Sequence, residues 1–226
     1  MDFFNDLASN PAITNAIPTA TLQTLQMVGI SGLFTVLIGL PLGIVLHSTA
    51  PGGLTPVRWL SFILSSVVVN ITRSIPFAIL MLSLIPLSVL IVGTSLGPIA
   101  ASVSLTIGTI PFFARLVETA LRDVHTGKID AALVMGSTRF QVVRKVLVPE
   151  AMPGLVAALT TTLVTLVGYS AMAGLVGGDG LGRLAYNYGF QRFETSVMIV
   201  ILVIMVLLVQ LIQVVGDALA RRVDHR

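Results

Sequence analysis

The chain has 226 residues, of which 55% are apolar and 10% are charged, and its net charge is +3. A soluble domain has about a quarter of its residues charged, so this composition excludes an ordinary water-soluble globular protein. The basic residues neither share one continuous face nor alternate with aromatic residues, and cysteine is absent, which excludes a typical nucleic-acid surface, disulfides, iron–sulfur clusters and thiol catalysis.

The N-terminal half contains two long stretches without a charged residue. There is none between Asp6 and Arg58, and none in residues 74–114. Because about 20 helical residues cross a bilayer core of about 30 Å, the second stretch must cross twice, with its turn at residues 93–98. Asp2 and Asp6 precede the first stretch without any Lys or Arg, so we expect that stretch to remain in the mature protein rather than be cleaved as a signal peptide.

Five apolar segments predict an all-α integral membrane protein. The segments are continuously apolar, whereas the strands of a membrane barrel alternate apolar and polar residues over about 10 positions. We place the spans at residues 22–46, 75–92, 98–116, 155–173 and 196–216 of a single transmembrane domain, residues 1–226. Residues 57–74 are interpreted as a helix at the membrane interface, with an early part of the second span as the alternative.

The distribution of Lys and Arg predicts the orientation of these spans, because cytoplasmic loops carry an excess of both residues. An outside N-terminus and an inside C-terminus leave only Arg183 and Arg192 outside. The basic residues then placed inside are Arg58, Arg73, Arg115, Arg122, Lys128, Arg139, Arg144, Lys145, Arg221, Arg222 and Arg226. We therefore predict an N-out, C-in topology.

Small residues and prolines within the spans predict local features. Gly39 and Gly43 form a GxxxG pair, which permits close helix approach either within one subunit or between subunits. Pro76, Pro86 and Pro111 each lack a backbone N–H, so we expect kinks or local unwinding there.

Residues 121–153 form a polar segment between two spans that is too long and too regular for a simple connector. Its first part, residues 129–136, predicts a short helix stopped by Gly136. Residues 138–141 then offer a capping box for a second helix, which is expected to end at Pro149.

The second of these helices is predicted to be amphipathic. Phe140, Val143 and Leu147 share one face, which predicts that this face is buried while the other stays in water. Spacing alone leaves two alternatives open, namely a helix lying on lipid headgroups and a docking surface for another protein.

A known pattern runs through this segment. Asp130-Ala131-Ala132, three residues, Gly136, nine residues and then residues 146–149 resemble the EAA loop of ABC importer permeases in every spacing. The departures are Asp130 for Glu, which is one methylene shorter, and valine at positions 146 and 148. In that family the loop seats in a groove of the ATPase subunit, so the resemblance implies a type I importer permease. The implied ATPase contacts are Asp130, Ala131, Ala132, Gly136, Ser137 and Arg139.

Residues 73–77, 91–97, 144–151 and 168–172 together resemble the permeases of methionine-uptake transporters, so the resemblance extends over nearly the whole chain. It implies import of L-methionine, with D-methionine as an open alternative, across the bacterial inner membrane by alternating access. It also implies a second copy of the chain, two cytoplasmic ATPase subunits that hold ATP and Mg²⁺, membrane lipid around the spans, and a periplasmic or lipid-anchored solute-binding protein.

The chain itself is expected to hold no cofactor and to catalyse no reaction. It has no G-x-x-x-x-G-K-[ST] phosphate-binding pattern, and its three histidines lack metal-ligand spacing. The glycine-rich residues 177–182 are interpreted as a flexible external loop rather than a nucleotide site. The surrounding residues 174–195 are the largest predicted outer surface. Its candidate contacts with the solute-binding protein are Asp179, Arg183, Tyr188 and Arg192.

Two sets of residues are candidates for the translocation pathway. They are Asn70, Arg73 and Ser74 near the inner membrane boundary, and Tyr169, Ser170 and Met172 in the fourth span. The alternative is that Arg73 anchors at the headgroups and Tyr169 packs between helices.

Three other functions stay open at this stage. The first is an importer of another amino acid or a small organic sulfur compound. The second is an ion-coupled secondary transporter, which is disfavoured because neither an internal repeat nor an ionisable residue at mid-membrane is evident. The third is a membrane scaffold whose loop recruits a cytosolic protein.

Overall fold

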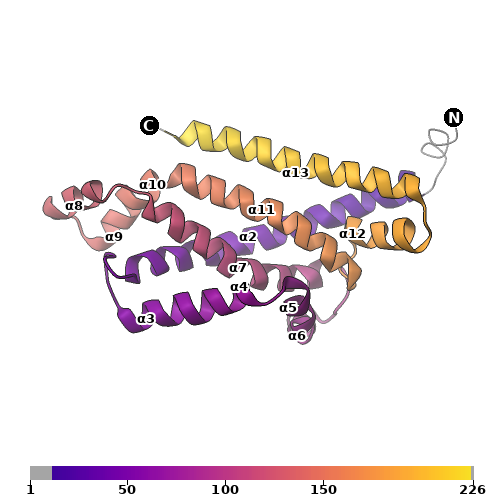
Figure 1. Ribbon diagram of the computed structural model, residues 1–226, viewed down its shortest axis with the longest axis horizontal. Coiled ribbons are helices and arrows are strands. Elements are labelled where there is room, and N and C mark those ends of the chain that lie inside the picture. Colours follow the sequence, from indigo (N-terminus) through magenta and orange to yellow (C-terminus); the bar gives the residue numbers. More distant parts are fainter. Residues whose placement is uncertain (1–11, 225–226) are drawn as a thin grey trace. The chain divides into compact units, whose positions relative to one another are not determined.

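The computed structural model describes residues 12–224, and within that range every regular element is a helix (Figure 1). His225 and Arg226 lie outside the described range, as do Asp2 and Asp6, on which the signal-peptide argument depends. The predicted all-α class is confirmed.

Four long helices correspond to four of the predicted spans. They are α2 (Ile17–Thr49), α7 (Pro98–Arg122), α11 (Met152–Leu175) and α13 (Thr195–Val223). Each is long and apolar enough to cross a membrane, since even 24 residues extend about 36 Å. Large apolar side chains are exposed along α13, among them Leu207 and Leu211, which suits a helix surrounded by lipid.

The predicted second span, residues 75–92, is wrong as a single helix. The chain forms α5 (Phe77–Ser83) and α6 (Ile85–Val92), and eight helical residues extend only about 12 Å. Pro76 directly precedes α5, and Pro86 lies in the first turn of α6. A proline is tolerated at these positions because its missing N–H has no partner within the helix, but it prevents one continuous helix from running through. A fifth span arises only if Arg58–Ser74 and Phe77–Ser83 are taken together as one broken span. The count of five and the N-out, C-in orientation stay predictions.

Short helices connect the long ones. Before α5 the chain forms α3 (Arg58–Phe62), η2 (Ile63–Ile71) and α4 (Thr72–Ser74), where η denotes a π-helix. The other short elements are η1 (Ala12–Ala16), α8 (Thr126–Val134), α9 (Arg139–Val142), η3 (Val143–Leu147), α10 (Val148–Glu150), α12 (Gly180–Leu184) and η4 (Ala185–Gln191).

The chain divides into two compact units, each described by itself. Unit 1 comprises the chain up to Phe34, Ile75–Gly108 and Leu163–Ile212, and unit 2 comprises Thr35–Ser74, Thr109–Thr162 and Gln213–Arg226. Four long helices contribute residues to both units. Organisation as a single transmembrane domain therefore stays a prediction.

The core of unit 2 joins α7, α11 and the segment between them. Val117, Leu121 and Leu147 are fully buried in one apolar cluster with Leu155. The partly buried Leu40 and Ile44 of α2 pack against the same cluster.

The two glycines of the GxxxG pair explain how closely α2 approaches α7. A Cβ on Gly39 would lie 2.9 Å from Phe113 Cδ1, and one on Gly43 would lie 2.6 Å from Val117 Cβ. The glycines therefore serve packing within one subunit, which was one of the two predicted alternatives.

Unit 1 has two apolar clusters. The first contains Met27, Leu105 and Leu166, and the second joins α2 to α12 and α13 through Ile17, Leu181 and Ile201. A hydrogen bond from Ser31 Oγ to the Ser102 carbonyl oxygen, 3.2 Å long, adds a polar contact between α2 and α7.

Replacement of Gly43 by alanine should destabilise the protein by about 1–3 kcal/mol, because the new methyl group overlaps Val117 and the Ala114 carbonyl oxygen. Gly29→Ala is the matched control in the same helix, since no heavy atom lies within 4 Å of its Cβ position. Thermal unfolding of the detergent-solubilised proteins measures both effects. Equal midpoints for the two variants would contradict the close α2–α7 approach.

Candidate functional site

The polar segment 121–153 folds as two short helices on either side of Gly136. The His125 Nδ1 atom accepts a hydrogen bond of 3.1 Å from the Gly127 N–H and caps the start of α8. At the other end Gly136 has φ +83°, while Gly136 N–H and Ser137 N–H donate to the carbonyls of Leu133 and Ala132. This pair of bonds is the Schellman arrangement, which needs a left-handed residue at the glycine position. The predicted helix stop at Gly136 is confirmed.

The predicted capping box is also confirmed. Thr138 N–H donates to Gln141 Oε1 over 2.8 Å, and Gln141 N–H donates to Thr138 Oγ1 over 3.3 Å. The predicted helix end at Pro149 is wrong, because helical turns continue through η3 and α10 to Glu150. Pro149 lies in the first turn of α10, directly after the π-helix η3. A proline is tolerated in a first helical turn, so the helical conformation continues through it.

The predicted buried face is right for Leu147, which is buried, and for Val143, which packs against the same cluster, but wrong for Phe140, which is 72% exposed. Ala132 and Val142 are buried as well. The helix begins after the Thr138 cap, and Phe140 in its first turn is not part of the apolar cluster that contains Leu147. Val134 and Met135 are also largely exposed, at 87% and 79%. Val134, Met135 and Phe140 form what we call the apolar tip, and exposed apolar groups of this size mark interaction surfaces.

The remaining predicted ATPase contacts lie around the same turn. Asp130, Ala131 and Arg139 are exposed, Ser137 is half-buried, and Ala132 faces inward. Within the described part of the chain, the Asp130 carboxylate makes no hydrogen bond or ion pair. It lines a cavity of about 680 Å³ whose other polar side chains are His47, Arg122 and Thr126.

An ion pair connects the two ends of this segment. Lys128 Nζ lies 2.5 Å from Glu150 Oε2 and links α8 to α10. Both side chains are partly exposed, so the pair contributes at most about 1 kcal/mol, and the buried apolar residues do most to hold the two helices together.

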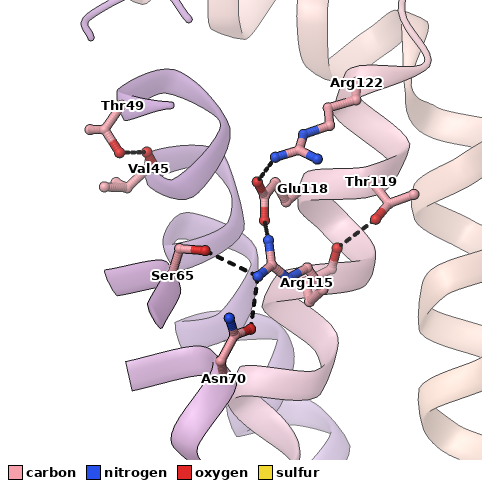
Figure 2. Close-up of polar contacts among 8 residues, drawn as sticks. All are labelled: Val45, Thr49, Ser65, Asn70, Arg115, Glu118, Thr119 and Arg122. Atoms are coloured by element: carbon pink, nitrogen blue, oxygen red, sulfur yellow. Dashed lines mark hydrogen bonds and ion pairs between the residues drawn. The ribbon is translucent and has the colours of Figure 1, made fainter. Parts of the chain in front are cut away.

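A charged network that the sequence interpretation missed lies in α7 of the same unit (Figure 2). The Glu118 side chain is only 3% exposed, and its two oxygens lie 2.5 Å from Arg115 Nη1 and 2.5 Å from Arg122 Nη2. Arg115 Nη2 also donates to Ser65 Oγ over 3.0 Å and to Asn70 Oδ1 over 2.9 Å. We refer to these five residues as the Glu118 network.

Helix geometry explains why the three charged residues meet. Positions 115, 118 and 122 are spaced by three and four residues, which places their side chains on one face of α7. The same spacing is present in the sequence at the end of an apolar span and is the signal for this network.

The inner pathway candidates lie in η2 and α4. Asn70 belongs to the Glu118 network, and its carbonyl accepts a 2.8 Å hydrogen bond from Ser74 Oγ. Arg73 and Ser74 are exposed. These three residues therefore share one helical turn, and their part in a pathway stays a prediction.

The other pathway candidates belong to unit 1. Tyr169 stacks on Phe77, with ring centroids 3.9 Å apart and an interplanar angle of 2°. Ser170 is buried, with its hydroxyl donating to the Val167 carbonyl, and Met172 is 46% exposed. The stacking matches the alternative in which Tyr169 packs between helices, and a pathway role for this set stays a prediction.

The glycine-rich residues 177–182 do not form the flexible loop that the sequence predicts. Gly180, Leu181 and Gly182 are buried. Gly180 N–H donates to Gln23 Oε1 over 3.1 Å, and Leu181 N–H donates to Thr24 Oγ1 over 2.9 Å. Two side chains of α2 thus cap α12, and only glycine fits so close to the neighbouring helix.

The four predicted contacts for a solute-binding protein form two pairs in this region. Asp179 makes an ion pair with Arg183, and the Arg192 guanidinium lies 4.5 Å from the centroid of the Tyr188 ring. Asp179 has φ +61°, a strained value for a residue other than glycine. Asp179, Arg183 and Tyr188 line a cavity of about 530 Å³. Among residues 12–224 no group of three or more His, Cys, Asp or Glu could hold a metal ion.

Relatives among known proteins match nearly the whole chain. Residues 39–226 match the family described as binding-protein-dependent transport system inner membrane component. The chain is 53% identical over 224 residues to the probable D-methionine transport system permease protein MetI of Vibrio cholerae, covering 99% of both chains. It is 54% identical over 152 residues to the D-methionine transport system permease protein MetI of Escherichia coli K12, covering 67% of this chain and 70% of that protein.

Solved structures agree with these relatives. A structure of the MetNI methionine ABC transporter in an inward-facing conformation superposes with a TM-score of 0.92 and 49% identity. The match covers 96% of this chain and 100% of that chain. The fold is therefore that of a type I ABC importer permease.

Replacement of Thr24 by valine should destabilise the protein by about 1–3 kcal/mol, because the buried Leu181 N–H loses its acceptor while the side-chain shape is kept. Thr24→Ser retains the hydroxyl and is the control. Thermal unfolding in detergent compares the two variants. If they unfold at the same temperature, the hydroxyl does not hold α12.

Proposed function

Because the chain belongs to the family of binding-protein-dependent transport system inner membrane components, we propose that it is the permease subunit of an ATP-driven importer that carries methionine across the bacterial inner membrane. The observation that carries this proposal is the turn around Gly136. It stands at the position of the family's EAA loop and presents an apolar tip between two helices that are anchored by buried residues such as Ala132 and Val142.

The apolar tip supports docking to a separate ATPase subunit. Val134, Met135 and Phe140 are exposed, so a partner that covers them gains about 25 cal/mol for each Å² of apolar surface buried. Asp130 is exposed and unpaired among the described residues, and it offers a charge to a basic group of that partner. The ATPase, rather than this chain, then binds ATP and Mg²⁺ and catalyses hydrolysis.

Two copies of the permease with two ATPase subunits form the transporter in this proposal. A closed two-fold places two identical loops over two identical ATPases. Closure of the ATPases moves both loops and opens the permease pair outward, and hydrolysis returns it to the inward-open state. The loop lies on the cytoplasmic side, as the Lys and Arg distribution predicts.

On the outer side, Asp179, Arg183, Tyr188 and Arg192 serve as contacts for the solute-binding protein. This assignment is supported because both pairs lie in one short segment held against α2 by the Gln23 and Thr24 side chains.

Arg73, Ser74 and Met172 are exposed and are therefore, within their own units, the pathway candidates most accessible to a substrate.

The substrate assignment rests on the relatives, whose printed names specify methionine or D-methionine. Cells with and without this chain should differ in uptake of labelled L-methionine. Competition by unlabelled L-methionine, D-methionine and other amino acids then ranks the substrates. Equal uptake in both cell types would contradict methionine import.

Gly136→Glu should abolish ATP-dependent uptake while leaving membrane insertion intact. The new side chain places a charge beside the apolar tip and forces a left-handed backbone on a residue with a Cβ, which costs about 1–2 kcal/mol. Uptake and co-purification of the ATPase are measured together. Normal uptake at normal expression would contradict docking at this turn.

Gly93→Glu is the matched control for that experiment. Gly93 has φ +84°, no heavy atom lies within 4 Å of its Cβ position, and it follows α6 rather than α8. It carries the same backbone strain and the same charge, but it belongs to unit 1 and lies outside the docking segment in the sequence. Co-purification should therefore survive Gly93→Glu and fail for Gly136→Glu.

A further inference from the structure

Glu118 stands out because it is an ionisable residue buried in a helix that is apolar enough to span a membrane. Such residues are expensive to bury and usually have a function. Its carboxylate is shared by two arginines, so the three side chains carry one net positive charge. The neutral acceptors Ser65 Oγ and Asn70 Oδ1 receive the remaining hydrogen bonds of Arg115.

The segment to which Arg115 donates these hydrogen bonds, η2, has an unusual backbone. Ser65 and Asn70 both lie in η2, a π-helix of nine residues, whereas π-helices normally appear as single turns at functional sites. The two residues are five positions apart. In an α-helix that spacing places side chains about 140° apart around the axis. In a π-helix, whose hydrogen bonds join residues five apart, the two side chains lie near the same side.

Arg115 can therefore bond Ser65 and Asn70 together only while η2 keeps its π-helical register. At the other end of the network, Arg122 is the last residue of α7 and lies three residues before the His125 cap of α8. Arg122 also lines the cavity next to Asp130. The network thus runs, within unit 2, from the start of the ATPase-docking segment to η2, which carries Asn70 and is followed directly by α4 with Arg73 and Ser74.

We propose that Glu118 is a positioning residue for transport: by holding Arg115 it keeps η2 in its π register, and movement of the docking segment acts on η2 through Arg122 and Glu118. This inference rests on the proposed function, since it assigns the docking segment to an ATPase. It adds a named residue, which touches neither substrate nor ATP, to the coupling between hydrolysis and the pathway.

The test uses the complete transporter, with its ATPase and solute-binding protein, in proteoliposomes. The measured quantity is methionine imported per ATP hydrolysed. Glu118→Gln should assemble and hydrolyse ATP, but this ratio should fall at least about fivefold, the lower end of typical coupling between sites. Asp217→Asn is the control, because it removes an exposed carboxylate of α13 outside the network, and its ratio should match the wild type.

A second variant distinguishes a positioning role of Glu118 in transport from a role in stabilising the fold alone. Replacing a whole buried ion cluster by apolar residues of similar size usually preserves the fold. The triple variant Arg115→Met, Glu118→Leu, Arg122→Met should therefore assemble with the ATPase, yet keep the low ratio. Recovery of the wild-type ratio in the triple variant would overturn the proposal, as would an unchanged ratio in Glu118→Gln. If Glu118→Gln fails to assemble, the triple variant alone decides.

A readout that is independent of the substrate distinguishes failure of this inference from failure of the proposed function. The chain has no cysteine, so Ser66→Cys places one thiol on η2. Its alkylation rate by a water-soluble maleimide should change when a non-hydrolysable ATP analogue is added, and Glu118→Gln should abolish that change. A rate insensitive to nucleotide in the wild-type background overturns the inference, whereas absent methionine uptake with a sensitive rate overturns only the substrate assignment.

Discussion

A bilayer interior offers no water to backbone N–H and C=O groups, and this constraint governs the whole structure. It favours helices that satisfy their own backbone, as in α2, α7, α11 and α13. Pro76 and Pro86 stand at helix starts, where a missing N–H leaves no carbonyl without its bond. Pro111 instead lies inside α7, which continues past it, so the unwinding predicted there is not seen. The helices then associate through close packing and interhelical hydrogen bonds, which makes the glycine contacts between α2 and α7 important.

The same constraint shapes how the protein treats charge. Glu118 is buried, but each of its oxygens meets an arginine, and the surplus donors of Arg115 meet Ser65 and Asn70. A lone buried carboxylate would be strongly destabilising, whereas a fully satisfied network is tolerated and fixes one arrangement of the helices around it. That fixed arrangement involves a π-helix, a geometry that needs such support.

In the proposed function, the segment around Gly136 separates anchoring from recognition. Ala132, Val142 and Leu147 face the core of unit 2 and fix the two short helices, while the apolar tip remains uncovered. A rigid base with an exposed apolar surface suits a part that must transmit movement from a partner, because a loosely held loop would absorb that movement. This geometry supports the proposed docking of an ATPase, and the family relationship supports the import function.

The sequence by itself determined the all-α class, four spans, the Gly136 stop and the Thr138 cap, because hydropathy and capping are local properties of a few consecutive residues. It did not determine that residues 75–92 break into two helices, that Phe140 is exposed, or that residues 177–182 are packed against α2. Those outcomes depend on which distant residues lie nearby. Only the tertiary structure brought Ser65 and Asn70 to Arg115, across 50 and 45 positions of the chain.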